Sequence, residues 1–144
     1  MSMQINFADW LAIANCKARY CRLLDSKDWD GWGGLMLPDF TLDVRGSGGP
    51  LIEGREAAVA SVRASLENVR TCHQVHSPEI EIDADEARAV FAMQDRLIRP
   101  DGHAMQGWGH YHERYRRIDG TWLLASSRLT RLFMEIDEAP AQIL

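Results

Sequence analysis

The first half of the 144-residue chain carries apolar residues at helical spacing. Between about Phe7 and Ser26 they recur every three or four positions, which turns one face of a helix toward a core. That face consists of Phe7, Trp10, Leu11, Ala14, Ala18 and Cys21. A second helix is predicted from Asp28 to Leu37, because Asp28 is a favourable N-cap and Pro38 stops a helix. An alanine-rich stretch from Arg55 to Val69 predicts a third helix.

The spacing changes to a period of two in the second half. FTLDV, from Phe40 to Val44, is an early strand, and RGSGGP, from Arg45 to Pro50, is a loop by its glycine and proline content. The later alternation predicts four strands, at Thr71–Asp83, Ala87–Arg99, His103–Ile118 and Thr121–Ile136. Asp119-Gly120 is the strongest hairpin signal. The predicted fold class is α+β, with N-terminal helices packed on a strongly curved mixed or antiparallel sheet that forms a cone-shaped pocket, in one domain over residues 1–144.

Composition narrows the possible partners. The net charge is −5 and no basic stripe is present, so we expect neither a nucleic acid nor a membrane surface as partner. The start, MSMQINFADW, lacks the pattern of a signal peptide. The three cysteines, Cys16, Cys21 and Cys72, are interpreted as buried free thiols, which favours a reducing, cytoplasmic location. No phosphate-binding or metal-ligand motif is present, and we predict no cofactor and no metal.

Asp25 and His73 are the first pair of candidate catalytic residues. Asp25 falls near the apolar face of the first helix, where a carboxylate is costly unless it is paired. It either caps the next helix or lies past the helix end in water, or it projects into a cavity and orients a base. His73 begins the first long strand, in TCHQV, and is either structural or a base that Asp25 orients. Such a pair fixes the imidazole tautomer and leaves the other ring nitrogen free to accept a proton.

Three further polar residues are candidates, each with a structural alternative. Tyr20, at the edge of the first helix's apolar face, is either a core tyrosine or a donor to a substrate carbonyl. Asp95 shares a strand face with apolar Phe91 and Met93, so it is either a pocket group or a strand end in water. Arg128, in SSRLT, is either a surface salt-bridge partner or a pocket cation.

These segments resemble a known family. LLDSKDWDGW and FTLDVRG are similar to the helix-turn-strand of scytalone dehydratase, TCHQV resembles the stretch that carries its catalytic histidine, and RYRRIDGTWLLA resembles its final hairpin. The resemblance runs from about Ala12 to Phe133. The chain is therefore identified as a member of the SnoaL-like branch of the NTF2-like superfamily, near the scytalone dehydratase-type lyases.

The resemblance implies that Asp25 and His73 form the proton-abstracting dyad found in scytalone dehydratase, hexachlorocyclohexane dehydrochlorinase and a bile-acid dehydratase. It also implies that Tyr20 and Asp95 match a tyrosine and a second aspartate of the bile-acid enzyme. The two tyrosines that polarise the carbonyl in scytalone dehydratase correspond here to Leu24 and Val44, so scytalone itself is not the expected substrate. The predicted substrate pocket is lined by Leu24, Val44, Phe91, Met93 and Tyr111.

The resulting functional hypothesis is a cofactor-independent lyase, a dehydratase of a small, largely apolar cyclic molecule. Catalysis is assigned to His73 and Asp25, with Tyr20, Asp95 or Arg128 stabilising an oxyanion or protonating the leaving hydroxide. The alternatives are an isomerase or cyclase using the same base, a non-catalytic ligand-binding protein, and a module like a ring-hydroxylase small subunit. A homodimer or higher oligomer is expected through the outer sheet face, unless the tail from Glu135 to Leu144 covers that face in a monomer. That face consists of Gln74, His76, Val90, Ala92, Gln94, His110 and His112.

Overall fold

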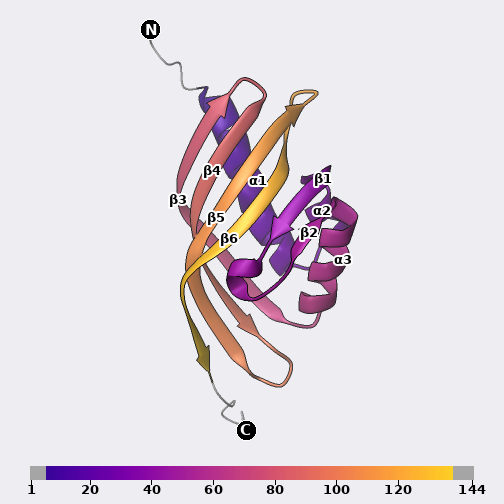
Figure 1. Cartoon of the computed structure of the whole chain (residues 1–144), viewed down its shortest axis with the longest axis vertical. Helices are drawn as coiled ribbons and strands as arrows, with labels where there is room; N and C mark the ends of the chain where they lie inside the picture. Colours follow the sequence, from indigo (N-terminus) through magenta and orange to yellow (C-terminus); the bar gives the residue numbers. More distant parts are fainter. Residues whose placement is uncertain (1–5, 138–144) are drawn as a thin grey trace.

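The computed structural model describes residues 6–137. Its sheet has six strands in the order β2-β1-β6-β5-β4-β3, and it curves around the long helix α1 (Figure 1). The helices are α1 (Phe7–Asp25), α2 (Trp29–Gly33) and α3 (Arg55–Leu66), and a short 3-10 turn spans Arg45–Ser47. The strands are β1 (Met36–Asp43), β2 (Leu51–Glu53), β3 (Arg70–Asp83), β4 (Glu86–Ile98), β5 (Ala104–Ile118) and β6 (Thr121–Asp137). The predicted α+β class is confirmed.

Helix α1 begins where Asn6 caps it, since the Asn6 side chain accepts from the backbone N–H groups of Ala8 and Asp9 at 3.1 and 3.3 Å. The helix packs on β3 and β6. Its buried face is Ile13, Cys16, Lys17, Tyr20, Cys21 and Leu24. The predicted face was therefore partly wrong, because Ala18 is exposed and the charged Lys17 is fully buried.

The antiparallel meander predicted for the second half is confirmed, with β3, β4, β5 and β6 pairing in order. The Asp119-Gly120 turn joins β5 to β6, and both residues have positive φ, of 50° and 80°. Such angles are those of the tight hairpin turn that this dipeptide favours. Strand β1 lies parallel to β6 on the other side, so the complete sheet is mixed.

The prediction was less accurate between Asp28 and Val69. Asp28 does cap α2, accepting from the Gly31 N–H at 2.9 Å, but the helix ends at Gly33 and β1 begins at Met36. Pro38 therefore lies in a strand rather than after a helix. It falls between the paired positions Met36 and Thr41, where the ladder is irregular, so its missing N–H removes no ladder bond. The short strand β2 was not predicted.

The side chains that turn toward α1 come from alternate residues of each long strand. On β4 they are Ala87, Ala89, Phe91, Met93 and Asp95, all buried. Within residues 6–137, no helix has the length and apolar character needed to cross a membrane. The tail that was considered as a cover for the outer face begins as strand, since Glu135–Asp137 continue β6, and its residues 138–144 lie outside the described residues.

Candidate active site

The structure brings Asp25 and His73 into direct contact. Asp25 is the last residue of α1, and His73 lies on the inner face of β3. The distance from His73 Nδ1 to Asp25 Oδ1 is 2.7 Å, and the backbone N–H of His73 donates to Asp25 Oδ2 at 2.8 Å. Because an ionised carboxylate only accepts, this contact places the proton of the neutral imidazole on Nδ1 and leaves Nε2 unprotonated.

Two neighbours hold Asp25 in place. The Thr71 hydroxyl donates to Asp25 Oδ1 at 2.9 Å, and Lys27 Nζ donates to the Thr71 oxygen at 2.9 Å. Burial lowers the pKa of Lys27 and the nearby Asp25 charge raises it, with burial the larger effect. Lys27 lies just past the end of α1 with φ 62°, an uncommon angle for a residue with a side chain. The aspartate therefore receives three hydrogen bonds that fix its orientation.

On the other side of the imidazole lies a second carboxylate, already paired. Asp95 is 4% exposed, and Arg131 donates to both of its oxygens at 2.7 and 2.8 Å. Arg131 Nε also donates to Ser47 Oγ at 2.6 Å, which ties the loop after β1 to this site. The Asp95 Oδ2 atom lies 3.9 Å from His73 Nε2, too far for a hydrogen bond. The imidazole thus sits between two carboxylates and keeps Nε2 free.

A glycine provides the space for the Asp95–Arg131 pair. Gly107 lies opposite Asp95 in the β4–β5 register. A Cβ atom at this position would clash with Arg131 Nη1 and would lie 2.8 Å from Asp95 Oδ1. Any side chain here would force the pair to shift, so glycine leaves the room that the pair occupies.

Tyr20 and Tyr111 lie beside one another, with ring centroids 6.1 Å apart at an interplanar angle of 69°. Both rings are buried, and burial raises the pKa of each phenol well above its ordinary value. The Asp95 charge contributes to the raised pKa of Tyr111, which places this phenol within electrostatic range of the Asp95–His73 group. Neither phenol hydroxyl has a hydrogen-bond partner among residues 6–137.

Arg128 is not part of this constellation. It is exposed on β6 and pairs in register with His112, on the face opposite His73. Its placement as a pocket cation was wrong, because β6 has irregular register and the side chain that turns inward to Asp95 is Arg131, three residues later. Arg131 is thus the residue that the sequence analysis missed. Because the register of β6 is irregular, counting alternate residues along the strand does not identify Arg131 as inward-facing.

The predicted pocket residues all lie on the inner side. Leu24, Phe91, Met93 and Tyr111 are buried, and Val44 is half-buried against the same core. Met93 contacts the polar group, since its Sδ lies 3.6 Å from Arg131 Nη1. Apolar side chains therefore lie beside the polar group that contains His73, Asp95 and Arg131.

The cysteines and the outer histidines take no part in this site. Cys16 and Cys21 are buried and free, and burial raises the pKa of their thiols to about 12 and about 11. Cys72 is also free but exposed, so the expectation that it is buried was wrong. His110 and His112 lie on the outer face. Within residues 6–137, no group of three or more His, Cys, Asp or Glu side chains is arranged to hold a metal ion.

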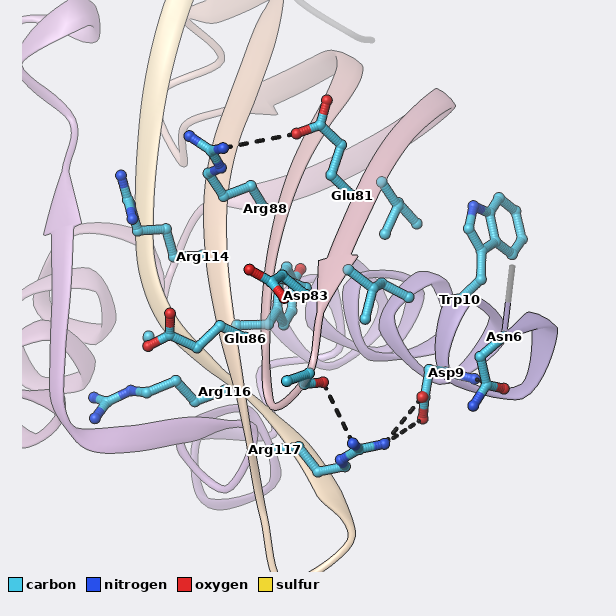
Figure 2. A pocket seen from close by; sticks show the side chains of 16 residues that line it. Asn6, Asp9, Trp10, Glu81, Asp83, Glu86, Arg88, Arg114, Arg116 and Arg117 are labelled. Carbon is cyan, nitrogen blue, oxygen red and sulfur yellow. Dashed lines mark hydrogen bonds and ion pairs between the residues drawn. The ribbon is translucent and has the colours of Figure 1, made fainter. Parts of the chain in front are cut away.

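A cavity of about 1070 Å³ lies elsewhere, where the N-terminal end of α1 meets the β3–β4 turn. Its lining contains no histidine, cysteine, serine, threonine or lysine. Two pairs of its charged side chains contact one another, Arg117 with Asp9 and Arg88 with Glu81, as Figure 2 shows. None of the predicted site residues lines it. We therefore place the candidate active site at His73 and not in this cavity.

Comparison with known proteins shows the family to which the chain belongs. The SnoaL-like domain family matches residues 6–128, and the chain belongs to that family. The chain is similar to a probable cyclase, FGR4, of Gibberella zeae, with 28% identity over 137 residues, 86% of this chain and 91% of the relative. A protein of unknown function from Mycobacterium tuberculosis has the same fold, with a TM-score of 0.78, 29% identity, and 88% of this chain and 77% of that one covered. A type 2 hexachlorocyclohexane dehydrochlorinase has a TM-score of 0.83 at 16% identity, covering 95% and 97%, which shows likeness of fold.

Proposed function

We propose that the protein is a cofactor-independent lyase that removes water from a small, largely apolar cyclic substrate. The observation that carries the proposal is the state of His73. Its Nδ1 is held by Asp25 at 2.7 Å, while its Nε2 has no hydrogen-bond partner among the described residues. A histidine oriented on one side and free on the other is the usual form of a general base.

The reaction begins when Nε2 removes a proton from the carbon next to a substrate carbonyl. The electron pair moves onto the carbonyl oxygen, and the unpaired hydroxyls of Tyr20 and Tyr111 are the donors that stabilise this oxyanion. When the enolate collapses, the bond to the β-hydroxyl breaks. Hydroxide takes the proton back from Nε2, and the products are an unsaturated ketone and water. The Asp25 carboxylate stabilises the imidazolium in the interval.

The surroundings of the dyad define the class of substrate. Met93 and Phe91 bring apolar surface to the site, and the tyrosine rings add two aromatic walls. The Arg131 guanidinium is neutralised by Asp95, so it is not free to attract a carboxylate or phosphate. We therefore expect a neutral, mostly apolar ring that carries a ketone and a β-hydroxyl group.

The test is turnover of a panel of cyclic β-hydroxy ketones, followed by the mass of the product. We expect wild-type protein to release water and His73→Ala to be slower by about 10²–10⁴-fold. The matched control is His76→Ala, since His76 lies on the same strand but is exposed on the opposite face. Equal rates for the wild type and His73→Ala would contradict the proposal.

An isomerase or cyclase is the second candidate, because the sequence relative from Gibberella zeae is named a probable cyclase. The same base would remove the proton, and the anion would then be reprotonated or would close a ring without losing a group. Product mass separates the two: a lyase product is lighter by one water, and an isomerase product has the mass of its substrate.

Non-catalytic ligand binding is less well supported. A binding module has no need to orient an imidazole, whereas here Asp25 accepts three hydrogen bonds, two of them from His73. A module like a ring-hydroxylase small subunit would require a partner chain for its activity. Turnover by the isolated chain, lost in His73→Ala, would exclude both alternatives.

The chain's own assembly is the last part of the proposal. Trp108 and Phe133 stack on the outer sheet face with centroids 4.5 Å apart, and Phe133 is 53% exposed. Exposed aromatic surface beside the amide and imidazole groups of this face favours burial against a second copy. We expect sedimentation equilibrium to give at least twice the 16.3 kDa chain mass and Ala92→Arg, at the centre of this face, to lower it. A wild-type mass near one chain would contradict the dimer.

A further inference from the structure

A lysine is buried in the core behind the proposed site. Lys17 is 0% exposed, and its Nζ lies 2.8 Å from Oε2 of Glu113, which is also without exposed side-chain surface. The other Glu113 oxygen accepts the Tyr115 hydroxyl at 2.6 Å. Burying two charges costs several kcal/mol per ion before their attraction is counted, and apolar replacements are often equally stable. Folding alone therefore does not account for Lys17.

The lysine also contacts the two phenols of the site, through their faces. Lys17 Nζ lies 3.6 Å from the centroid of the Tyr20 ring and 3.5 Å from that of the Tyr111 ring. The three N–H bonds of an ammonium match these three neighbours, one carboxylate and two ring faces. One cation thus fixes the positions of both aromatic rings.

The hydroxyl groups of these rings are left unused by the protein. Buried tyrosines usually donate their O–H to a partner, as Tyr115 does here. Tyr20 and Tyr111 have none within residues 6–137, and the fully buried side-chain atoms without a partner there are Trp32 Nε1 and Ser127 Oγ. Each of the two tyrosines is 4% exposed, and neither hydroxyl is among those atoms. Rings held by their faces keep their hydroxyls available for a ligand.

We propose that Lys17 is a positioning residue, which presents the Tyr20 and Tyr111 hydroxyls as a pair of donors to one substrate oxygen. Its ammonium contacts the faces of both rings, which fixes the orientation of each ring and with it the direction in which each hydroxyl points. The ligand chemistry that this pair fits is a carbonyl oxygen that becomes an enolate. The inference rests on the proposed function, because it assigns the oxyanion site of that reaction.

The experiment compares kcat and KM in a compensated variant. Lys17→Met alone leaves Glu113 buried without its cation and is expected to be too unstable to test, so it is combined with Glu113→Gln, which still accepts from Tyr115. We expect Lys17→Met/Glu113→Gln to fold and to lose about tenfold or more in kcat, with KM little changed. Ile13→Val, a core change one turn earlier on α1, is the control for general destabilisation and should keep its kcat.

A double-mutant cycle shows whether Lys17 acts through the phenols. When Tyr20→Phe and Tyr111→Phe have removed both hydroxyls, the Lys17→Met/Glu113→Gln change should cost no further activity. A stable compensated variant with wild-type kcat would overturn the inference, and so would an equal loss in both backgrounds. Neither of these two outcomes affects the comparison of His73→Ala with the wild type, which tests the proposed function itself. If the wild type turns over no substrate of the panel, the proposed function fails and this inference fails with it.

Discussion

The Asp95–Arg131 pair allows a sharp prediction about stability. Both side chains are nearly inaccessible, with 4% and 8% of their surface exposed, and the guanidinium contacts both carboxylate oxygens. Arg131→Met keeps most of the apolar stem and removes the charge. Asp95 is then a buried carboxylate without a cation, and Ser47 loses its donor.

The magnitude follows from the burial of the pair. Removing one partner of a buried ion pair costs about 3–5 kcal/mol, because the remaining charge is uncompensated. The unfolding entropy is about 2.1 cal/mol/K per residue, which gives roughly 0.3 kcal/mol/K for 144 residues. We therefore expect Arg131→Met to lower Tm by about 10–16 °C.

The assay is urea unfolding followed by circular dichroism, with thermal unfolding beside it. Arg128→Met is the matched control, since Arg128 is exposed on the same strand, and it should change stability by no more than about 0.5 kcal/mol. Asp95→Asn/Arg131→Met removes both charges and should recover much of the loss. If Arg131→Met is within about 1 kcal/mol of wild type, the pair is not the buried, mutually dependent unit described here.

Three further outcomes are expected. Gly107→Ala should cost about 1–3 kcal/mol, because its Cβ would displace the Asp95–Arg131 pair, whereas Gly34→Ala, with only ordinary contacts at 3.4 Å, should be nearly neutral in the same urea assay. Hydrogen bonds from Trp122 and then the Arg117 charge hold the pKa of Asp9 below its ordinary 3.8, so its contribution to stability is present above pH 3.8 and is lost as pH falls through the lower folded value. Unfolding free energy measured against pH should therefore fall less steeply in acid for Asp9→Asn, and parallel curves would contradict this. Burial raises the pKa of all three tyrosines above 10.0, so native protein should show no tyrosinate absorbance near pH 10, and their contribution to stability should be lost only as pH rises beyond it. A native tyrosine that ionises near pH 10 would contradict their burial.

The sequence predicted most of the fold because local signals agreed with the tertiary arrangement. The alternation after Thr71 and the Asp119-Gly120 turn specify a meander that needs no information from distant residues. The first half was harder. Strand β2 has only three residues, and β1 follows so closely on α2 that the chain between Asp28 and Pro38 has the spacing of a single helix.

The candidate site shows a different limit. Asp25 and His73 could be singled out because a carboxylate near an apolar helix face is unusual and a resemblance pointed to the histidine. Lys17 and Arg131 could not, since a charged residue within a helix or strand is ordinarily read as solvent-exposed. Lys17 is buried only because it pairs with Glu113 on β5, and Arg131 is buried only because it pairs with Asp95 on β4. Such pairs depend on strand register, which a bulge shifts by one residue.

The distribution of charge inside the protein supports the proposal that His73 is the group that takes up a proton. Glu113 is paired with Lys17, and Asp95 is paired with Arg131, so each acid is neutralised where it stands. Asp25 receives hydrogen bonds but touches no permanent cation, because Lys27 reaches it only through Thr71. Its negative charge is balanced fully only when the imidazole is protonated. Proton uptake at Nε2 therefore creates a compensated ion pair in place of an uncompensated anion, which favours the proton-abstraction step that the dyad is proposed to perform.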